Sequence, residues 1–114
     1  MVLTPFERGL VAHLVADWVL QNDWMACNKQ SLVHPAAWTH AGIQGLCLGL
    51  ALGWQAGLVL GFVHLLIDTR RPLGWWMRHF KKCSGAPDVG TIAIWLDQTA
   101  HIVCVALWVA LARQ

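Results

Sequence analysis

The sequence predicts an all-α protein, an integral membrane four-helix bundle with a short interfacial helix between helices 3 and 4. Three observations predict this fold. The chain is 57% hydrophobic and only 12% charged, whereas about 25% of the residues of a soluble domain are charged. Its 10 Gly and 8 Trp are typical of membrane helices and of the membrane–water interface. Long apolar segments alternate with polar connections.

Length and charge limit the remaining alternatives. The 114 residues are enough for one domain, so residues 1–114 are predicted to form a single transmembrane helical domain. The net charge of +2 and the lack of a dense basic run argue against a nucleic-acid partner. The four cysteines are widely spaced, and we interpret them as reduced, apolar side chains.

The first helix is predicted to begin at Pro5 and to end near Gln21. Thr4 can cap it, Pro suits the first helical position, and Glu7 completes a capping box with Thr4. The connection 22–35 follows, with a short interfacial turn expected around Trp24 and Met25.

Pro35 is predicted to open the second helix, which is rich in glycine at three- and four-residue spacing. That spacing lets another helix backbone approach closely, so the second helix is also a candidate surface for a homo-oligomer. No charged residue occurs between Ala41 and Ile67. We therefore expect a tight hairpin near residues 53–57, with arms slightly shorter than the ~20 residues that cross a bilayer.

The third helix is predicted to end at residues 68–72, where Arg70, Arg71 and Pro72 suit a helix C-terminus. In the next segment, aromatic residues alternate with Arg78, Lys81 and Lys82, which is typical of a helix lying on a membrane surface. Asp88 is expected to cap the fourth helix.

The basic residues predict a topology. Six of the eight Lys and Arg lie in the connections 22–35 and 69–88, which share one side of an up-down bundle. The positive-inside rule makes that side cytoplasmic. The predicted location is therefore multi-pass, in the cell inner membrane, with the lipid bilayer as a partner.

Ionisable side chains recur four residues apart within the apolar segments. The pairs are His13 and Asp17, His64 and Asp68, and Asp97 and His101, and His40 adds a fourth histidine. Residues four apart share one helix face. Burial in an apolar bundle is costly for such groups, so they must face inward and find partners. We expect one polar layer near the side that holds the two basic connections.

A metal site is the chemistry that this layer favours. Imidazole and carboxylate suit Zn, Mn or Fe, so the predicted cofactor is one or two divalent transition-metal ions. All seven residues are candidate ligands, and Asp17, Asp68 and Asp97 are also the candidate catalytic residues. Gln21 and Gln98 are predicted to hold the carboxylates by hydrogen bonds. A proton relay, ion transport or a purely structural network remain alternatives.

The order of these residues resembles a family of small bacterial and phage membrane proteins classed as a domain of unknown function. The pattern comprises His13-x-x-x-Asp17-x-x-x-Gln21, then His40, then His64-x-x-x-Asp68, then Asp97-Gln98-x-x-His101, and it covers most of the chain. The chain is also loosely similar to membrane-bound metal-dependent hydrolases, which implies hydrolysis by analogy.

These observations together predict a membrane-embedded, metal-dependent hydrolase that acts on an ester or phosphoester. A metal ion would lower the pKa of an attacking water toward neutrality. The substrate is expected at the cytoplasmic interface, as a lipid or lipid-linked molecule. Arg70, Arg71 and Arg78 are the candidates for binding the substrate or anionic headgroups.

Overall fold

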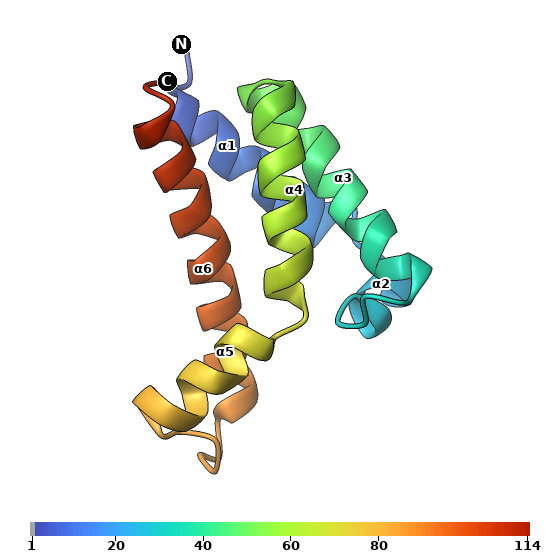
Figure 1. Ribbon diagram of the computed structural model, residues 1–114, viewed down its shortest axis with the longest axis vertical. Coiled ribbons are helices and arrows are strands. Elements are labelled where there is room, and N and C mark those ends of the chain that lie inside the picture. The colour runs from blue at the N-terminus through green and yellow to red at the C-terminus, as the bar shows by residue number, and fades with distance from the viewer. Residues whose placement is uncertain (1) are drawn as a thin grey trace.

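The computed structural model describes residues 2–114, and all of its regular elements are helical (Figure 1). The all-α part of the prediction is therefore confirmed. The elements are α1 (Pro5–Leu14), the π-helical η1 (Val15–Val19), α2 (Asp23–Asn28), α3 (Pro35–Leu52), α4 (Trp54–Asp68), α5 (Arg71–Trp76), the π-helical η2 (Met77–Lys81) and α6 (Val89–Leu111).

The start of α1 follows the predicted capping box. Glu7 N donates to Thr4 Oγ1 at 3.2 Å, and Thr4 N donates to Glu7 Oε2 at 2.9 Å. The helix then widens into η1, where Leu20 N donates to Val15 O. Single π-helical turns are frequent at functional sites, and this one carries Asp17.

The α3–α4 hairpin turns where the sequence predicted a turn. Gly53, with φ of 108°, is the only residue between the two helices, and this backbone angle strongly favours glycine. The glycines then let the helices touch backbone to backbone, because a Cβ on Gly57 would lie 2.5 Å from Gly45 O. Gly45 and Gly57 thus serve packing within the chain, and homo-oligomer assembly through this helix stays a prediction.

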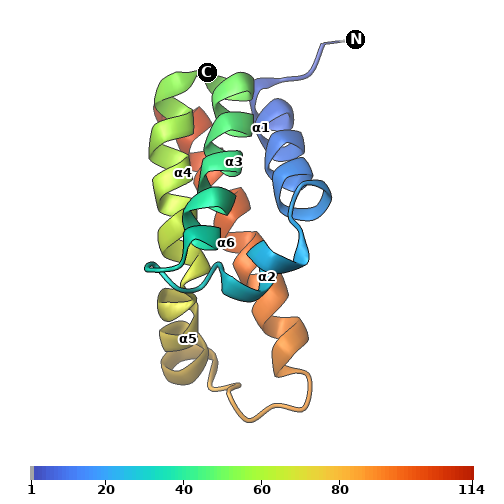
Figure 2. The same cartoon turned by 90° about the vertical axis from the view of Figure 1, so that its right-hand side faces the viewer.

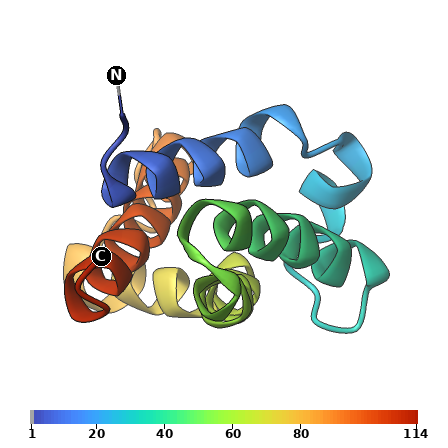
Figure 3. The same cartoon turned by 90° about the horizontal axis from the view of Figure 1, so that it is seen from above.

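Four helices enclose a common interior. Seen from above, α1 lies across the bundle and contacts both α3 and α6, while α4 contacts α3 and α6 (Figure 3). The apolar core fills the end of the bundle near the two termini. It consists of Leu48, Leu52, Ala56, Leu60 and Val105.

The connections form small helices at the other end (Figures 1 and 2). Asn22 Oδ1 accepts from Met25 N and so caps α2. Arg70, with φ of 58°, separates α4 from α5. A short helix is present in the predicted segment as α5 and η2, on which Trp75, Trp76 and Phe80 are exposed. Asp88 precedes α6, but its side chain makes no capping hydrogen bond, unlike the prediction.

The prediction of an integral membrane four-helix bundle is wrong. Among residues 2–114, α6 is the one helix that is long and apolar enough to cross a membrane, which is weak evidence for a span. The α4 helix has only 15 residues, and the 18 residues of α3 include the polar Thr39, His40 and Gln44. The α1 helix ends after 10 residues. The compact all-α fold therefore does not support a multi-pass inner-membrane location.

Candidate metal centre

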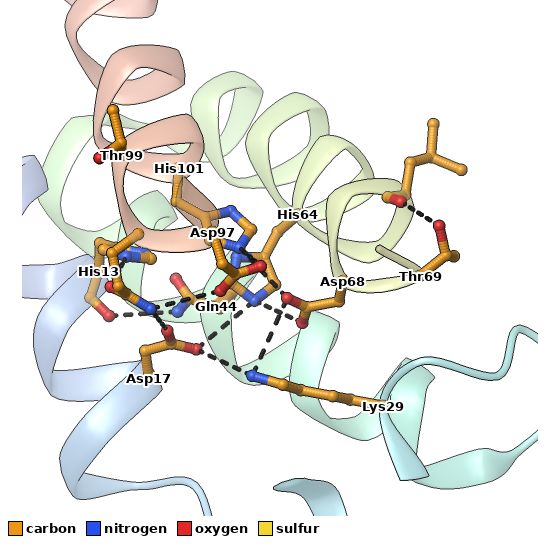
Figure 4. Close-up of polar contacts among 12 residues, drawn as sticks. His13, Asp17, Lys29, Gln44, His64, Asp68, Thr69, Asp97, Thr99 and His101 are labelled. Carbon is orange, nitrogen blue, oxygen red and sulfur yellow. Dashed lines mark hydrogen bonds and ion pairs between the residues drawn. The ribbon is translucent and has the colours of Figure 1, made fainter. Parts of the chain in front are cut away.

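All seven His and Asp residues of the predicted polar layer are buried in one cluster (Figure 4). Each is at most 3% exposed. They come from α1 and η1, α3, α4 and α6, so every helix of the interior contributes. The cluster comprises His13, Asp17, His40, His64, Asp68, Asp97 and His101.

Four of these side chains converge on one point between η1, α3 and α4. His40 Nε2 lies 2.9 Å from Asp17 Oδ1 and 3.3 Å from Asp68 Oδ2. His64 Nε2 lies 3.7 Å from Asp17 Oδ1 and 2.9 Å from Asp68 Oδ2. The two Nε2 atoms are themselves 2.9 Å apart. Two nitrogen and two oxygen atoms that could bind a metal ion, from η1, α3 and α4, thus face each other.

No protonation state satisfies these contacts together. Each Nε2 needs a hydrogen to bond its carboxylate oxygen, yet two N–H groups cannot point at each other across 2.9 Å. If one nitrogen gives up its hydrogen, its lone pair faces a carboxylate. A cation at the centre resolves the conflict, because all four atoms then offer it lone pairs.

The spacing of the four atoms suits a tetrahedral ion. Bonds of about 2.0–2.2 Å to nitrogen and oxygen separate the ligand atoms by about 3.3–3.6 Å. Five of the six separations among the four atoms, all except that between Asp17 Oδ1 and Asp68 Oδ2, lie between 2.9 and 3.7 Å. Asp17, His40 and His64 form one group that could hold a metal ion, and His64, Asp68 and His101 form a second, overlapping one.

Asp68 joins the centre to α6 through its other oxygen. Its Oδ1 accepts from His101 Nε2 at 3.2 Å. His101 Nε2 also lies 3.5 Å from Asp97 Oδ1. That Asp97 oxygen is buried and has no hydrogen-bond partner among the described residues. It is therefore a carboxylate oxygen that remains available to a ligand.

Two glutamines hold the cluster on the α1 and α6 side. Gln98 Nε2 donates to Asp17 Oδ2, and Gln98 Oε1 accepts from His13 Nε2 at 3.0 Å. Gln44 Nε2 donates to the carbonyl oxygen of His13 at 3.1 Å. His13 therefore lies in the layer but outside the two groups that could hold a metal.

The electrostatics keep Asp17 and Asp68 ionised and His64 neutral near neutral pH. Burial alone would raise the pKa of Asp17 and of Asp68. Hydrogen bonds from His40 and Gln98 at Asp17, and from His101 and His64 at Asp68, together with the charge of Lys29 outweigh burial, so both pKa values fall below the usual range. Burial lowers the pKa of His64 to about 4. Metals bind such deprotonated ligands.

His101 titrates in the opposite direction. Burial alone would lower its pKa, but the hydrogen bond to Asp68 and the negative charges of the nearby Asp68 and Asp97 together outweigh burial and raise the pKa to about 9. In the absence of a metal, His101 is therefore the cation of the cluster near neutral pH. The pKa of His13 is lowered instead, because burial and the nearby His101 both disfavour its protonated form.

Lys29 belongs to this site, although it lies in the connection 22–35, outside the helices that the sequence predicted. Its Nζ lies 3.9 Å from Asp17 Oδ1 and 4.0 Å from Asp68 Oδ1. A lysine outside every apolar segment carries no periodic signal of burial, and lysine is usually exposed. The only sequence signal is that Asn22 caps a helix here, which directs α2 against α3.

The remaining predicted residues lie outside the cluster. Gln21 is half-buried and makes no hydrogen bond to a carboxylate among the described residues, so its predicted function there is not supported. The chain bends between η1 and α2, and this bend separates Gln21 from Asp17. Arg71 and Arg78 are exposed and Arg70 is half-buried. Binding of substrate or headgroups by these three arginines stays a prediction.

Comparison with known proteins identifies a family. The model of the family described as Protein of unknown function (DUF3307) matches residues 6–114, nearly the whole chain. No curated protein and no solved structure matches the chain significantly.

Proposed function

The chain belongs to the DUF3307 family of proteins of unknown function, and we propose that it binds one divalent transition-metal ion and uses it for hydrolysis. Asp17, His40, His64 and Asp68 would hold the ion. The observation that carries this proposal is the mutual approach of their four donor atoms, whose hydrogen-bonding needs conflict without a cation.

The charge of the cluster supports one ion. Three buried carboxylates, of Asp17, Asp68 and Asp97, face one buried ammonium, of Lys29. Two negative charges remain. If the imidazoles are neutral, a single divalent ion neutralises both. Buried charges persist only when they are compensated in this way. Mixed imidazole and carboxylate ligands favour Zn, Mn or Fe over Ca or Mg.

Hydrolysis of an ester or phosphoester is the reaction that this centre supports best. When bound, a divalent ion supplies Lewis acidity. Asp97 is the carboxylate whose Oδ1 is not committed to a hydrogen bond, so it is our candidate for accepting a proton from the attacking water. His101, 3.5 Å from that oxygen, would orient it.

A structural metal centre is the second candidate, and one observation favours it. The four donor atoms all come from the protein and their residues are at most 3% exposed, as in closed structural zinc sites. Ion transport has less support, because the apolar cluster around Leu48, Leu60 and Val105 fills the bundle on the side of the termini.

A lipid bilayer is the partner that the surface favours. Many large apolar side chains are exposed, including Leu50, Leu58 and Phe62 on α3 and α4. Exposed apolar areas of this kind mark protein or membrane contacts. On α5 and η2, exposed Trp75 and Trp76 lie beside basic residues, a combination that binds anionic headgroups. We propose that Arg70, Arg71 and Arg78 face such headgroups, or a lipid-linked substrate.

Elemental analysis of the protein purified in a mild detergent tests the metal. We expect about one equivalent of a transition metal in the wild type and almost none in His64→Ala. The matched control is His79→Ala, which removes an exposed histidine and should keep the metal. Metal-free wild-type protein that is folded and does not take up Zn, Mn or Fe on dialysis would disprove the proposal.

Asp97→Asn separates the two candidate functions. In a hydrolase, this variant keeps the metal but loses about 10²–10⁴-fold in hydrolysis of bis(p-nitrophenyl) phosphate or of a p-nitrophenyl ester. In a structural centre, the wild type hydrolyses neither compound, and removing the metal with a chelator unfolds the protein.

A further inference from the structure

Lys29 is a buried charged residue of the site that is not a candidate metal ligand. It is 8% exposed, and its Nζ approaches Asp17 and Asp68 only to 3.9 and 4.0 Å. Hydrogen bonds to oxygen are about 1 Å shorter. The ammonium donates no hydrogen bond to any residue of the described part of the chain. Three N–H donors therefore lie at the centre without a protein acceptor.

The backbone of Lys29 is firmly held. Asn22 caps the first turn of α2, Met25 is buried, and Lys29 N donates to Met25 O at 2.9 Å. From this position the side chain extends toward the space beside Asp17 and Asp68 (Figure 4). The placement is thus set by α2 and not by a freely moving loop.

Lys29 also marks the side from which a ligand would arrive. Its side chain is 10% exposed, against 2% for the side chains of Asp17 and Asp68. Lys29 therefore has a more exposed side chain than the two carboxylates that it approaches. A molecule that approaches the carboxylates from this side meets Lys29 first.

We propose that Lys29 binds a phosphoryl oxygen, so that the substrate of the centre is a phosphoester. An anion beside Asp17 and Asp68 is repelled unless the metal ion is present, so this inference rests on the proposed function. With the ion in place, the ion and the ammonium form two adjacent positive charges. Such a pair stabilises phosphoryl oxygens, for which lysine is a common point-charge partner. A neutral carboxylic ester offers Lys29 no charge.

The reaction that follows is a balanced hydrolysis. The oxygen of a water molecule forms a new bond to phosphorus, and the bond from phosphorus to the ester oxygen breaks. The departing alcohol takes up one proton, and the second proton of water leaves through a carboxylate. Lys29 stays protonated throughout and acts as a binding residue.

Phosphate binding to metal-loaded protein tests this inference. Isothermal titration with inorganic phosphate is carried out on the wild type, Lys29→Met, Lys29→Arg and Arg113→Met. Lys29→Met keeps the length of the side chain but removes its charge, and Lys29→Arg keeps the charge. Arg113→Met removes an exposed positive charge near the other end of the molecule. The metal content of each variant is measured on the same sample.

We expect Lys29→Met to bind phosphate at least about tenfold more weakly, as for the loss of a charged hydrogen bond. Lys29→Arg should lose less, and Arg113→Met nothing. Equal phosphate affinity in Lys29→Met and wild type, with equal metal content, overturns the inference and leaves the metal centre standing. Loss of metal from Lys29→Met also overturns it, since Lys29 would then stabilise the centre itself. A wild type without metal overturns the proposed function instead.

Two substrates distinguish the source of the phosphoryl group. The first is p-nitrophenyl phosphate in solution, and the second is phosphatidylglycerol in mixed detergent micelles. Lys29→Met should slow whichever of them the wild type hydrolyses, with the larger effect on KM because the residue acts in binding. If p-nitrophenyl acetate is hydrolysed and neither phosphoester is, the substrate class is wrong.

Discussion

Asp68 and His101 connect the candidate metal centre to the longest helix, because Asp68 Oδ1 accepts from His101 Nε2 at 3.2 Å. The other oxygen of Asp68 lies 2.9 Å from His64 Nε2. This second oxygen also lies 3.3 Å from His40 Nε2 on α3. One carboxylate thus links α4 with both α3 and α6, and it couples the converging side chains to the His101 cation.

Asp68→Asn is expected to abolish metal binding. The amide cannot supply negative charge to the centre, and its NH₂ group must face either His64 or His101. We expect less than about a tenth of the wild-type metal content, together with a loss of about 3–5 kcal/mol in stability, since His101⁺ loses its partner. Elemental analysis and urea unfolding measure the two effects. Asp88→Asn, an exposed carboxylate at the start of α6, is the matched control. Full metal occupancy in Asp68→Asn would contradict the assignment of this ligand.

The stability of the metal-free protein is expected to fall as pH rises from 6.5 to 9. The pKa of His101 is about 9 in the folded protein against 6.5 for the ordinary group. The folded state therefore holds a proton that the unfolded state has lost, and this stabilisation is complete below pH 6.5 and disappears above pH 9. Its size is at most about 3 kcal/mol. Thermal unfolding between pH 6 and pH 10 measures it, and in His101→Gln the slope should be absent.

The same protein should also lose stability as pH falls from 6.5 toward 4. Burial lowers the pKa of His64 to about 4, so the unfolded chain takes up a proton that the folded protein refuses. The metal-free protein is therefore most stable near pH 6.5. His64→Gln should flatten the acid side of the profile and leave the alkaline side unchanged. A wild-type maximum above pH 9 would be inconsistent with both shifts.

Metal binding near pH 7.5 is expected to release about one proton, and the proton should come from His101. His64 is already neutral and Asp68 already ionised at this pH. A divalent ion on Asp68 removes much of the negative charge that keeps His101 protonated. Calorimetric titration in buffers with different ionisation enthalpies gives the proton count. Release should be close to zero in His101→Gln, and equal release in both proteins would point to another group.

The α3–α4 hairpin offers a test of packing. In Gly57→Ala, the new Cβ would lie 2.5 Å from Gly45 O and 2.9 Å from Gly49 Cα, which are backbone atoms that cannot move separately. We expect a loss of about 1–3 kcal/mol in unfolding free energy, as for an overpacked core. Gly42→Ala is the matched control, because its Cβ would meet no atom within 4 Å. This change should raise stability by about 0.5–1 kcal/mol through helix propensity. Equal effects of the two changes would contradict the close approach.

Local patterns in the sequence predicted most helix limits and the residues of the polar layer. The capping box of Thr4 and Glu7, the turn at Gly53 and the end of α4 at Asp68 depend on neighbouring residues alone, and each lies where it was expected. The pairs four residues apart could be assigned to inward helix faces because burial of such groups demands partners.

Hydropathy misled the prediction about the membrane. The composition counts the apolar residues of the whole chain, whereas a membrane-spanning segment requires a single helix that is long and apolar enough. The sequence did not show that the π-helical η1 follows α1 after 10 residues. The apolar surface that composition detected is present, but it is carried by short helices.

Contacts between distant residues decided what the sequence by itself left open. His40 meets Asp17 across 23 positions of sequence, and His13 meets Gln98 across 85. Spacing along one helix cannot specify such pairs, because they depend on how helices pack. The sequence therefore determined which groups must be buried together and that they suit a metal. Only the tertiary structure decided that His40 and His64 lie together with Asp17 and Asp68. It also decided that His13 lies outside this group of four and that the Lys29 side chain extends to it from the end of α2.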